Sequence, residues 1–503
     1  MLNGIYNYIG KLRFPFVFLS LMMIGISMLN MKLMGISLTN PFSDIWDLIN
    51  SGERLFRLPD TFNRFLLFSF SFALIIYSFT FKKHKHVKIS QPFEKIIIFL
   101  LILYFFLNLI TPNGLNYVSI ALTIISIIYL IFFKGEIVLN RNEKLLAISS
   151  ILIFYFALSS AIFHDSNIRE LDNYARFLFI MPILILLKDI KISFKVISNT
   201  ISLASIAIGL FAIYSFLFNS QLRVYGFTST ATIFGNISML YFLFSFLLYT
   251  YSRQKSLSTA LPLIGMVLAL LAMVLSGTRG TLTAIPFVFI FLYIMNAKKI
   301  YNIGFKESSI TILLILFFTI TSGLSERMID GYNDYKLYKN NVVTSSWKNS
   351  GSIMPRMIIW EGSMNMIKNH PIKGVGLDNF NASLDSQIMS KDIPPIRIDP
   401  KNFSAGFNHA HNQFLDIFAK IGIFGFLLIL FLLYSFYRIF FDALKNKNTQ
   451  IFAILGLTTL ICYFAYMFTH VILSHQQSTL FMLYTLTIFA SLISNETNVE
   501  NSS

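Results

Sequence analysis

Apolar runs of about 20 residues recur along the chain, and they constrain its fold more than any other feature. A run of this length, wound as an α-helix, spans the hydrocarbon core of a membrane. The runs are continuous and lack the alternation of lipid-facing β-strands, so they predict helices rather than a barrel. We mark about fourteen runs, with bounds good to a few residues: 14–36, 64–81, 96–112, 115–133, 145–163, 176–188, 197–219, 233–251, 258–277, 280–297, 308–323, 411–437, 451–471 and 478–495.

Composition supports an all-α, polytopic membrane protein. Only 13% of the 503 residues are charged, whereas soluble domains carry about a quarter. The single cysteine, Cys462, lies within a run, so no intrachain disulfide is possible. The run that begins near Phe14 is too long for a cleavable signal peptide. The net charge of +16 usually reports topology in a multispanning protein, and we therefore expect no nucleic-acid partner.

Basic segments between the runs predict the topology. Six of them fall on one side together with Lys11 and Arg13: KKHKHVKISQPFEK, KGEIVLNRNEK, KDIKISFK, SRQKS, NAKKIYNIGFK and YRIFFDALKNKN. By the positive-inside rule this side is the cytoplasm, which holds both termini. The short loops on the outer side carry arginine and no lysine: Arg54, Arg57, Arg64, Arg169, Arg176, Arg223 and Arg279.

One large outer segment divides the chain. We expect an N-terminal transmembrane bundle over 1–323, a large outer loop over 324–410, C-terminal transmembrane helices over 411–495 and a cytoplasmic tail over 496–503. Within the loop, PRMIIWEGSMNMIKNHP has apolar residues at helical spacing and predicts an amphipathic helix near the membrane surface. The following IKGVGLDNF is typical of a turn.

Two outer arginines are candidate ligands for an anion. Arg279 stands in SGTRGTLTAIP, and Arg223 stands in QLRVYGFTSTATIFGN, each with glycines and hydroxyl side chains beside it at the end of an apolar run. Arginine matches phosphate geometry with its planar fork of donors. The alternative is that each arginine only sets the depth of a span. Two such sites favour an anionic ligand, and the diphosphate of a polyprenyl carrier would fit.

The segment NHAHNQFLDIFAKIGIFGF, residues 408–426, is the candidate for a general base. A helix that begins near His411, with Asn408 as its cap, places Gly422 and Gly425 on the His411 face, where they would let a neighbouring helix approach. The positive end of the helix dipole disfavours a histidine cation and so keeps the imidazole neutral, as a base requires. The alternative is an interfacial histidine that binds loop backbone.

A metal pair with His409 is a weaker interpretation. The spacing of two residues from His411 suits a helix poorly, and no acidic or thiol cluster completes a ligand set. We therefore expect no metal.

A base, outer cations and an aromatic outer loop together suit glycosyl transfer from a polyprenyl-diphosphate sugar to an acceptor hydroxyl. Composition alone leaves other anion-handling membrane proteins open.

HNQFLDIFAKIGIFG resembles the motif of the O-antigen ligase family: His, then Asn, Ser or Gln, nine residues, Gly, two residues, and Gly, Thr or Tyr. His411, Asn412, Gly422 and Gly425 match every specified position. SGTRG (276–280) and the stretch 355–380 resemble the arginine turn and the loop helix of the ligase/polymerase superfamily. The resemblance covers about 220–440, and the N-terminal half matches only as generic spans.

The resemblance implies a metal-independent, inverting glycosyltransferase of the GT-C type, without a cofactor, in the bacterial inner membrane. Because family ligases have about twelve spans, we expect about twelve to fourteen. Such an enzyme moves a polysaccharide from undecaprenyl diphosphate to the lipid A–core acceptor at the periplasmic face. Carried over, the catalytic residues are His411, Arg279 and Arg356, and the substrate-binding residues are Arg223, Arg279, Arg356, Asn412 and Trp360.

Related activities stay open. An O-antigen polymerase joins lipid-linked repeat units and would suit fourteen spans, whereas the complete histidine motif favours a ligase. A protein O-oligosaccharyltransferase usually carries a larger C-terminal part. A flippase or exporter is expected to place charged residues in the middle of several spans, where this sequence has almost none.

Overall fold

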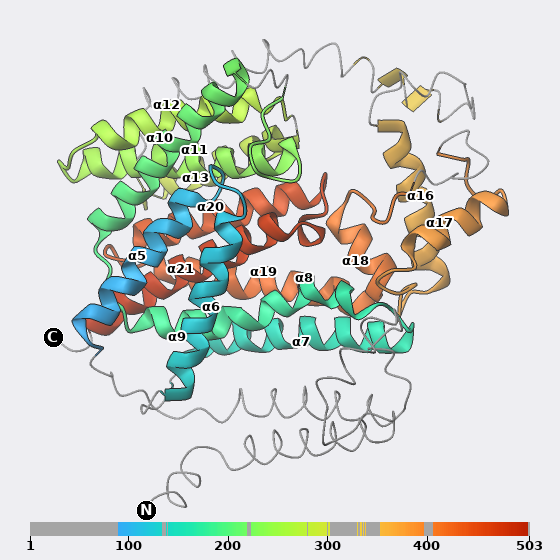
Figure 1. Cartoon of the computed structure of the whole chain (residues 1–503), viewed down its shortest axis with the longest axis horizontal. Helices are drawn as coiled ribbons and strands as arrows, with labels where there is room; N and C mark the ends of the chain where they lie inside the picture. The colour runs from blue at the N-terminus through green and yellow to red at the C-terminus, as the bar shows by residue number, and fades with distance from the viewer. Residues whose placement is uncertain are drawn as a thin grey trace, which may run out of the picture.

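The computed structural model describes residues 89–132, 137, 139–218, 223–278, 280–298, 300–301, 329, 332–333, 335–336, 338, 353–396 and 406–500. Residues 168, 353 and 496–500 are described as backbone only. Over these residues the protein is all-helical (Figure 1). Eight of the described helices are long and apolar enough to cross a membrane: α6 (Gly114–Phe132), α7 (Arg141–Phe163), α10 (Phe194–Phe218), α11 (Ala231–Gln254), η3 with α13 (Gly280–Ala297), α19 (Ile423–Ala443), α20 (Gln450–Met467) and α21 (Gln476–Glu500). In α21 the apolar part is Gln476–Asn495. The chain is thus a multi-pass membrane protein.

Not every predicted run is one of these eight helices. The runs 14–36, 64–81 and 308–323 lie outside the described residues. The run 96–112 corresponds to α5 (Gln91–Leu107), and the run 258–277 to the shorter α12 (Ala260–Leu275). The run 176–188 is not one long helix: it forms η2 (Arg176–Phe179) and the nine-residue α9 (Ile180–Lys188), which continue from η1 (Ile168–Leu171) and α8 (Asp172–Ala175).

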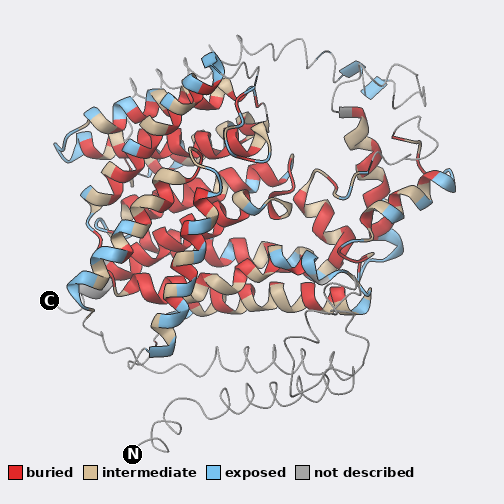
Figure 2. Ribbon diagram, in the orientation of Figure 1, coloured by how far each residue is buried: buried red, intermediate tan, exposed pale blue. Residues whose placement is uncertain are grey.

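Three helices form the centre of the bundle. Buried residues make up 89% of the apolar window in α11, 83% in α20 and 94% in α21, as the red ribbons of Figure 2 show. The same share is 33% in α6 and 28% in η3–α13, which lie at the periphery. A helix that is apolar all round has no polar face to show to water, so it is stable only in a core or in lipid.

One end of the bundle is fixed by a buried ion pair. Asn140 and Glu143 form a capping box that starts α7, each side chain bonding the other's backbone N–H. The Glu143 carboxylate also binds Lys188 Nζ at 2.8 Å and accepts a hydrogen bond from Ser494 Oγ at 2.8 Å. These contacts join α7, α9 and α21.

A smaller helical unit, which we call the loop module, lies at the opposite end (Figure 1). It consists of α16 (Ile353–Asn369), α17 (Phe380–Met389) and α18 (Gln413–Ile421). The helix predicted from the sequence 355–371 is therefore confirmed as α16. The module has its own apolar core, built from Met354, Ile358, Ile359, Met366, Ile367, Phe380, Leu384, Ile388, Ile393, Ile396, Ala410 and Ala419.

The predicted run 411–437 is divided by Gly422, so the expectation of one helix is wrong. Gly422 has φ +83° and ψ −168°, a backbone conformation that essentially only glycine adopts. α18 ends before it, and α19 starts after it. The predicted face that His411 shares with Gly422 and Gly425 therefore does not exist.

The close neighbour of Gly422 is a loop rather than a transmembrane helix. A Cβ at Gly422 would collide with the carbonyl group of Ile372. The same loop pairs with the end of α18, where Val375 N donates to Ala419 O at 2.8 Å and Ile423 N donates to Pro371 O at 2.9 Å. These bonds satisfy carbonyl and amide groups that a helix break leaves open, and they tie the loop module to α19.

Candidate active site

His411 lies immediately before α18, in a turn. Its φ is +50°, in the left-handed region that residues other than glycine seldom occupy. The cap of α18 is Asn412, not Asn408: its Oδ1 accepts hydrogen bonds from Phe414 N at 3.0 Å and Leu415 N at 3.1 Å. The helix therefore starts two residues later than predicted, because His411 turns the chain before the helix begins.

Four histidines from two segments gather at this turn. The ring centroids of His409 and His411 are 4.3 Å apart, and those of His409 and His475 are 6.3 Å apart. His470 stacks on His475 at 4.6 Å. His470 and His475 flank η5 (Ile472–Ser474), which joins α20 to α21. Figure 1 shows α18 and the adjoining ends of α20 and α21 facing one another. The pairing with His470 and His475 was not predicted, because it joins residues about 60 positions apart in the sequence.

The histidines are held in their neutral form. Burial, together with the nearby His409 and Arg356, lowers the pKa of His411 to about 3. Burial, together with Lys420 and His475, lowers the pKa of His409 to about 4. Burial also lowers the pKa of His475, and it lowers the pKa of His470 well below the ordinary value. A neutral imidazole can accept a proton.

Three of these ring nitrogens are buried with no hydrogen-bond partner among the described residues. They are His409 Nδ1, His470 Nε2 and His475 Nε2. The amide Nε2 of Gln413 is likewise buried without a hydrogen-bond partner among the described residues. A buried polar atom without a partner costs free energy. An oxygen-rich ligand is one group that could supply partners to these four nitrogens.

Arg356 and Trp360 come from α16, in the loop module. Arg356 lies near enough to the histidines to lower the pKa values of His409 and His411, and its own pKa is lowered by burial. The indole Nε1–H of Trp360 donates to Ala410 O at 2.9 Å. Its polar atom therefore bonds the histidine turn itself.

Arg223 packs on the turn that contains the arginine motif. Its Nε donates to Ser276 O at 3.2 Å, and its Nη2 lies 3.5 Å from Thr278 Oγ1. Arg279, the next residue, lies outside the described residues. The segments around 223 and 276–278, whose sequences predict an anionic ligand, are therefore adjacent in space.

The Arg223 loop also reaches the second histidine pair. Ser229 Oγ and His475 Nδ1 are 3.5 Å apart, and Gln477 Nε2 donates to Phe227 O at 2.9 Å. The start of α18 is bound to the same region, since Leu473 N donates to Gln413 Oε1 at 2.8 Å and Asn412 Nδ2 donates to Phe468 O at 3.2 Å. The histidine turn and the Arg223 loop thus meet around η5, at one end of the bundle.

Asp416 is a residue that the sequence analysis missed. Its Oδ1 accepts a hydrogen bond from Ala410 N at 3.0 Å, and its Oδ2 lies 3.2 Å from Lys420 Nζ. Both side chains are buried. The available signal was an acidic and a basic residue four positions apart in an otherwise apolar stretch, a spacing that lets a helix pair them.

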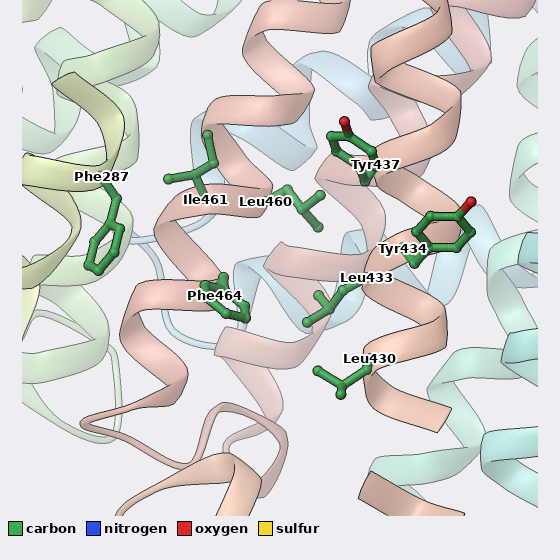
Figure 3. Close-up of a pocket in the computed structure, with 8 residues that line it drawn as sticks. All are labelled: Phe287, Leu430, Leu433, Tyr434, Tyr437, Leu460, Ile461 and Phe464. Carbon is green, nitrogen blue, oxygen red and sulfur yellow. The ribbon is translucent and has the colours of Figure 1, made fainter. Parts of the chain in front are cut away.

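An apolar groove lies beside the site, in the membrane-spanning part (Figure 3). It has a volume of about 380 Å³ and is lined by Phe287 of α13, by Leu430, Leu433, Tyr434 and Tyr437 of α19, and by Leu460, Ile461 and Phe464 of α20. Phe464 contacts Phe414 of α18, with ring centroids 5.6 Å apart. Phe414 is two residues beyond the capping Asn412.

No group of three or more metal-ligating side chains among the described residues is arranged to hold an ion. Metal independence stays an expectation that follows from the resemblance.

Two comparisons show similarity to known proteins. An uncharacterized protein of Haemophilus influenzae is 28% identical over 400 residues, which cover 78% of this chain and 96% of that protein. The sequence model of the O-antigen ligase family matches residues 264–430. The match includes the turn at Ser276–Thr278, α16, the histidine turn, α18 and the break at Gly422. Over residues 264–430 this membrane protein is therefore similar to the O-antigen ligase family, as the motif around His411 predicted.

Proposed function

We propose that the protein is a ligase that transfers O-antigen polysaccharide from undecaprenyl diphosphate to a hydroxyl of the lipid A–core, at the periplasmic face of the inner membrane. His411 is the general base that takes the proton from the acceptor hydroxyl. The diphosphate is the leaving group, so cations at its oxygens stabilise the charge that develops in the transition state. The reaction inverts the anomeric centre and needs no metal or cofactor.

The observation that carries the proposal is the position of His411 inside the matched domain. It stands in a turn at one end of the bundle, in a conformation that residues other than glycine seldom adopt, and its imidazole is neutral. Unusual backbone conformations collect at functional sites because the surrounding structure must hold them. A neutral imidazole at such a turn is the group that proton abstraction requires.

The arginines are proposed to bind the diphosphate. Arg356 lies close to the histidines, and Arg223 stacks on the turn before Arg279. Arg279 is included on the strength of the motif SGTRG alone. Guanidinium groups bind diphosphate oxygens bidentately, which a lysine cannot do.

The apolar groove is proposed to hold part of the polyprenyl chain. Its lining is hydrocarbon and aromatic, and its Phe464 contacts Phe414 beside the histidine turn. A lipid in the groove could therefore extend from the membrane core towards the end of the bundle where the charged groups lie. Binding energy gained along the chain would help to hold the diphosphate in place.

Deletion of the gene tests the reaction, read on a lipopolysaccharide gel. A ligase predicts complete loss of O-antigen together with accumulation of lipid-linked polymer. A core that carries one repeat unit would instead assign the polymerase reaction to this protein. Normal lipopolysaccharide in the deletion strain contradicts both.

Replacement of the base tests the mechanism. His411→Ala should abolish transfer, with expression and membrane insertion unchanged. His370→Ala is the matched control, since His370 is exposed at the end of α16, in the same loop module. Long-chain lipopolysaccharide from the His411→Ala strain would refute the assignment of the base.

A further inference from the structure

Ala410, between the two histidines of the turn, is held on both sides. Its N–H, in the peptide group shared with His409, donates to Asp416 Oδ1 at 3.0 Å. Its carbonyl, in the peptide group shared with His411, accepts from Trp360 Nε1 at 2.9 Å. Ala410 itself is fully buried. Both peptide planes that lead into the histidines are therefore fixed by side chains, one from α18 six residues further on and one from α16.

The two clamping side chains are themselves anchored. Asp416 is 2% exposed, and its second oxygen faces Lys420 Nζ at 3.2 Å. The Lys420 ammonium in turn lies 5.4 Å from the ring centroid of Phe380 in α17. Trp360 projects from α16, whose buried residues pack in the core of the loop module. The clamp therefore connects the turn to all three helices of the module.

We propose that Asp416 and Trp360 are positioning residues, which hold the Ala410 peptide groups and thereby aim His411 at the acceptor hydroxyl. This inference rests on the proposed role of His411 as base. Without the clamp, the left-handed turn at His411 is free to relax to a commoner conformation. A displacement of the base by about 1 Å can lower the rate a hundredfold.

The variants must separate the hydrogen bond from the ion pair. Asp416→Ala alone would leave Lys420 as a buried charge without its partner, which is itself destabilising. Both comparison variants therefore carry Lys420→Met. Asp416→Asn with Lys420→Met keeps an oxygen that can accept from Ala410 N, whereas Asp416→Ala with Lys420→Met removes it. The two variants share Lys420→Met and differ in the carboxamide group of residue 416, which carries the acceptor oxygen.

Transfer by the purified full-length chain, from undecaprenyl-diphosphate-linked O-antigen to lipid A–core, gives the readout. We expect Asp416→Ala with Lys420→Met to lower kcat by on the order of tenfold to a hundredfold, with KM for the lipid-linked donor almost unchanged. Asp416→Asn with Lys420→Met should restore most of the kcat. Equal kcat values in the two variants would overturn the proposal.

Trp360→Phe tests the second hydrogen bond of the clamp independently, because it keeps an aromatic ring in place and removes the N–H donor to Ala410 O. The same selective fall in kcat is expected. Asn365→Ala is the matched control: it removes another hydrogen bond of α16, from Asn365 Nδ2 to Gln387 Oε1 at 3.1 Å, without touching the turn. If Trp360→Phe and Asn365→Ala have the same kcat as the unaltered protein, the role of Trp360 is refuted.

His411→Ala in the same assay separates failure of the proposed base from failure of the proposed clamp. If His411→Ala still transfers glycan, His411 is not the base, and the positioning role of Asp416 and Trp360 is wrong as well. If His411→Ala is inactive while the clamp variants keep full kcat, the base stands and the clamp fails.

Discussion

At the scale of single residues, His411 combines two unfavourable states. A left-handed backbone conformation costs a residue other than glycine about 1–3 kcal/mol, and burial disfavours the charged form of its ring. The hydrogen bonds at Ala410 and the cap at Asn412 offset the first cost. The second keeps the ring neutral over a wide range of pH, and the same lowered pKa makes it a weaker base.

The pH dependence of transfer should reflect this lowered pKa. The value of kcat/KM reports groups of the free enzyme, and the base works only while it is neutral. Because burial lowers the pKa of His411 to about 3, kcat/KM should stay nearly constant from about pH 7 to about pH 5. Activity is lost only at lower pH, as His411 takes up a proton. A fall in kcat/KM centred near the ordinary histidine pKa of about 6.5 would contradict the assignment.

At the scale of elements, α18 is too short to span a membrane, with nine residues. It belongs to the loop module, and it connects the histidine turn at one end to the start of α19 at the other. Both ends are defined by specific residues. Asn412 caps the first turn, and Gly422 adopts the backbone conformation that ends α18 before α19 begins. The direction in which the histidines face thus depends on how α18 joins α19.

Gly422→Ala should disrupt this junction. The added Cβ meets the carbonyl of Ile372, and the backbone conformation costs a residue other than glycine on the order of 1–3 kcal/mol before that clash. We expect a lower thermal unfolding temperature in detergent and a loss of transfer. Leu427→Ala, at a half-exposed position on the same α19, is the control. Unaltered stability and activity of Gly422→Ala would show that the turn between α18 and α19 does not require glycine at this position.

Filling the apolar groove should weaken binding of the lipid-linked donor. Leu430→Trp places an indole in the space between α13, α19 and α20. KM for the donor should rise severalfold with kcat little changed, because the groove binds the chain equally in the ground and transition states. Leu427→Trp on the exposed side of α19 is the matched control. Identical KM values in both variants would place the polyprenyl chain elsewhere.

At the scale of the whole molecule, the two ends of the bundle differ. The loop module lies at one end (Figure 1). The other end holds the start of α7 and the end of α9, which carry the buried Glu143–Lys188 pair. A reaction that uses a lipid-linked donor needs its polar groups at one membrane face. The proposed topology makes the histidine end periplasmic.

Single-cysteine labelling tests this orientation. The natural Cys462 is fully buried and should react little. A small, membrane-impermeant maleimide should label Met389→Cys, at an exposed position of α17, in intact cells. Lys447→Cys, in the exposed turn between α19 and α20, should react only after the inner membrane is opened. The reverse pattern would invert the topology.

Much of the fold could be predicted from local sequence, and so could candidate residues for the site. The apolar runs predicted the spanning helices, and the motif spacing indicated His411 and Asn412 as candidates and predicted the similarity to the O-antigen ligase family. The break at Gly422 was missed because the run is apolar on both sides of it, so hydropathy does not change there. The split of 176–188 was missed for the same reason.

The sequence by itself determined that the chain lies in a membrane as helices, because burial of apolar runs and internal backbone bonding are local requirements. It also indicated the side chains that we propose for the chemistry. Only the tertiary structure decided that His470 and His475 join His409, that Arg223 meets the turn at Ser276–Thr278, and that Asp416 and Trp360 hold Ala410. These contacts join segments that local pattern does not relate, and they form only when helix packing brings the segments to the same end of the bundle.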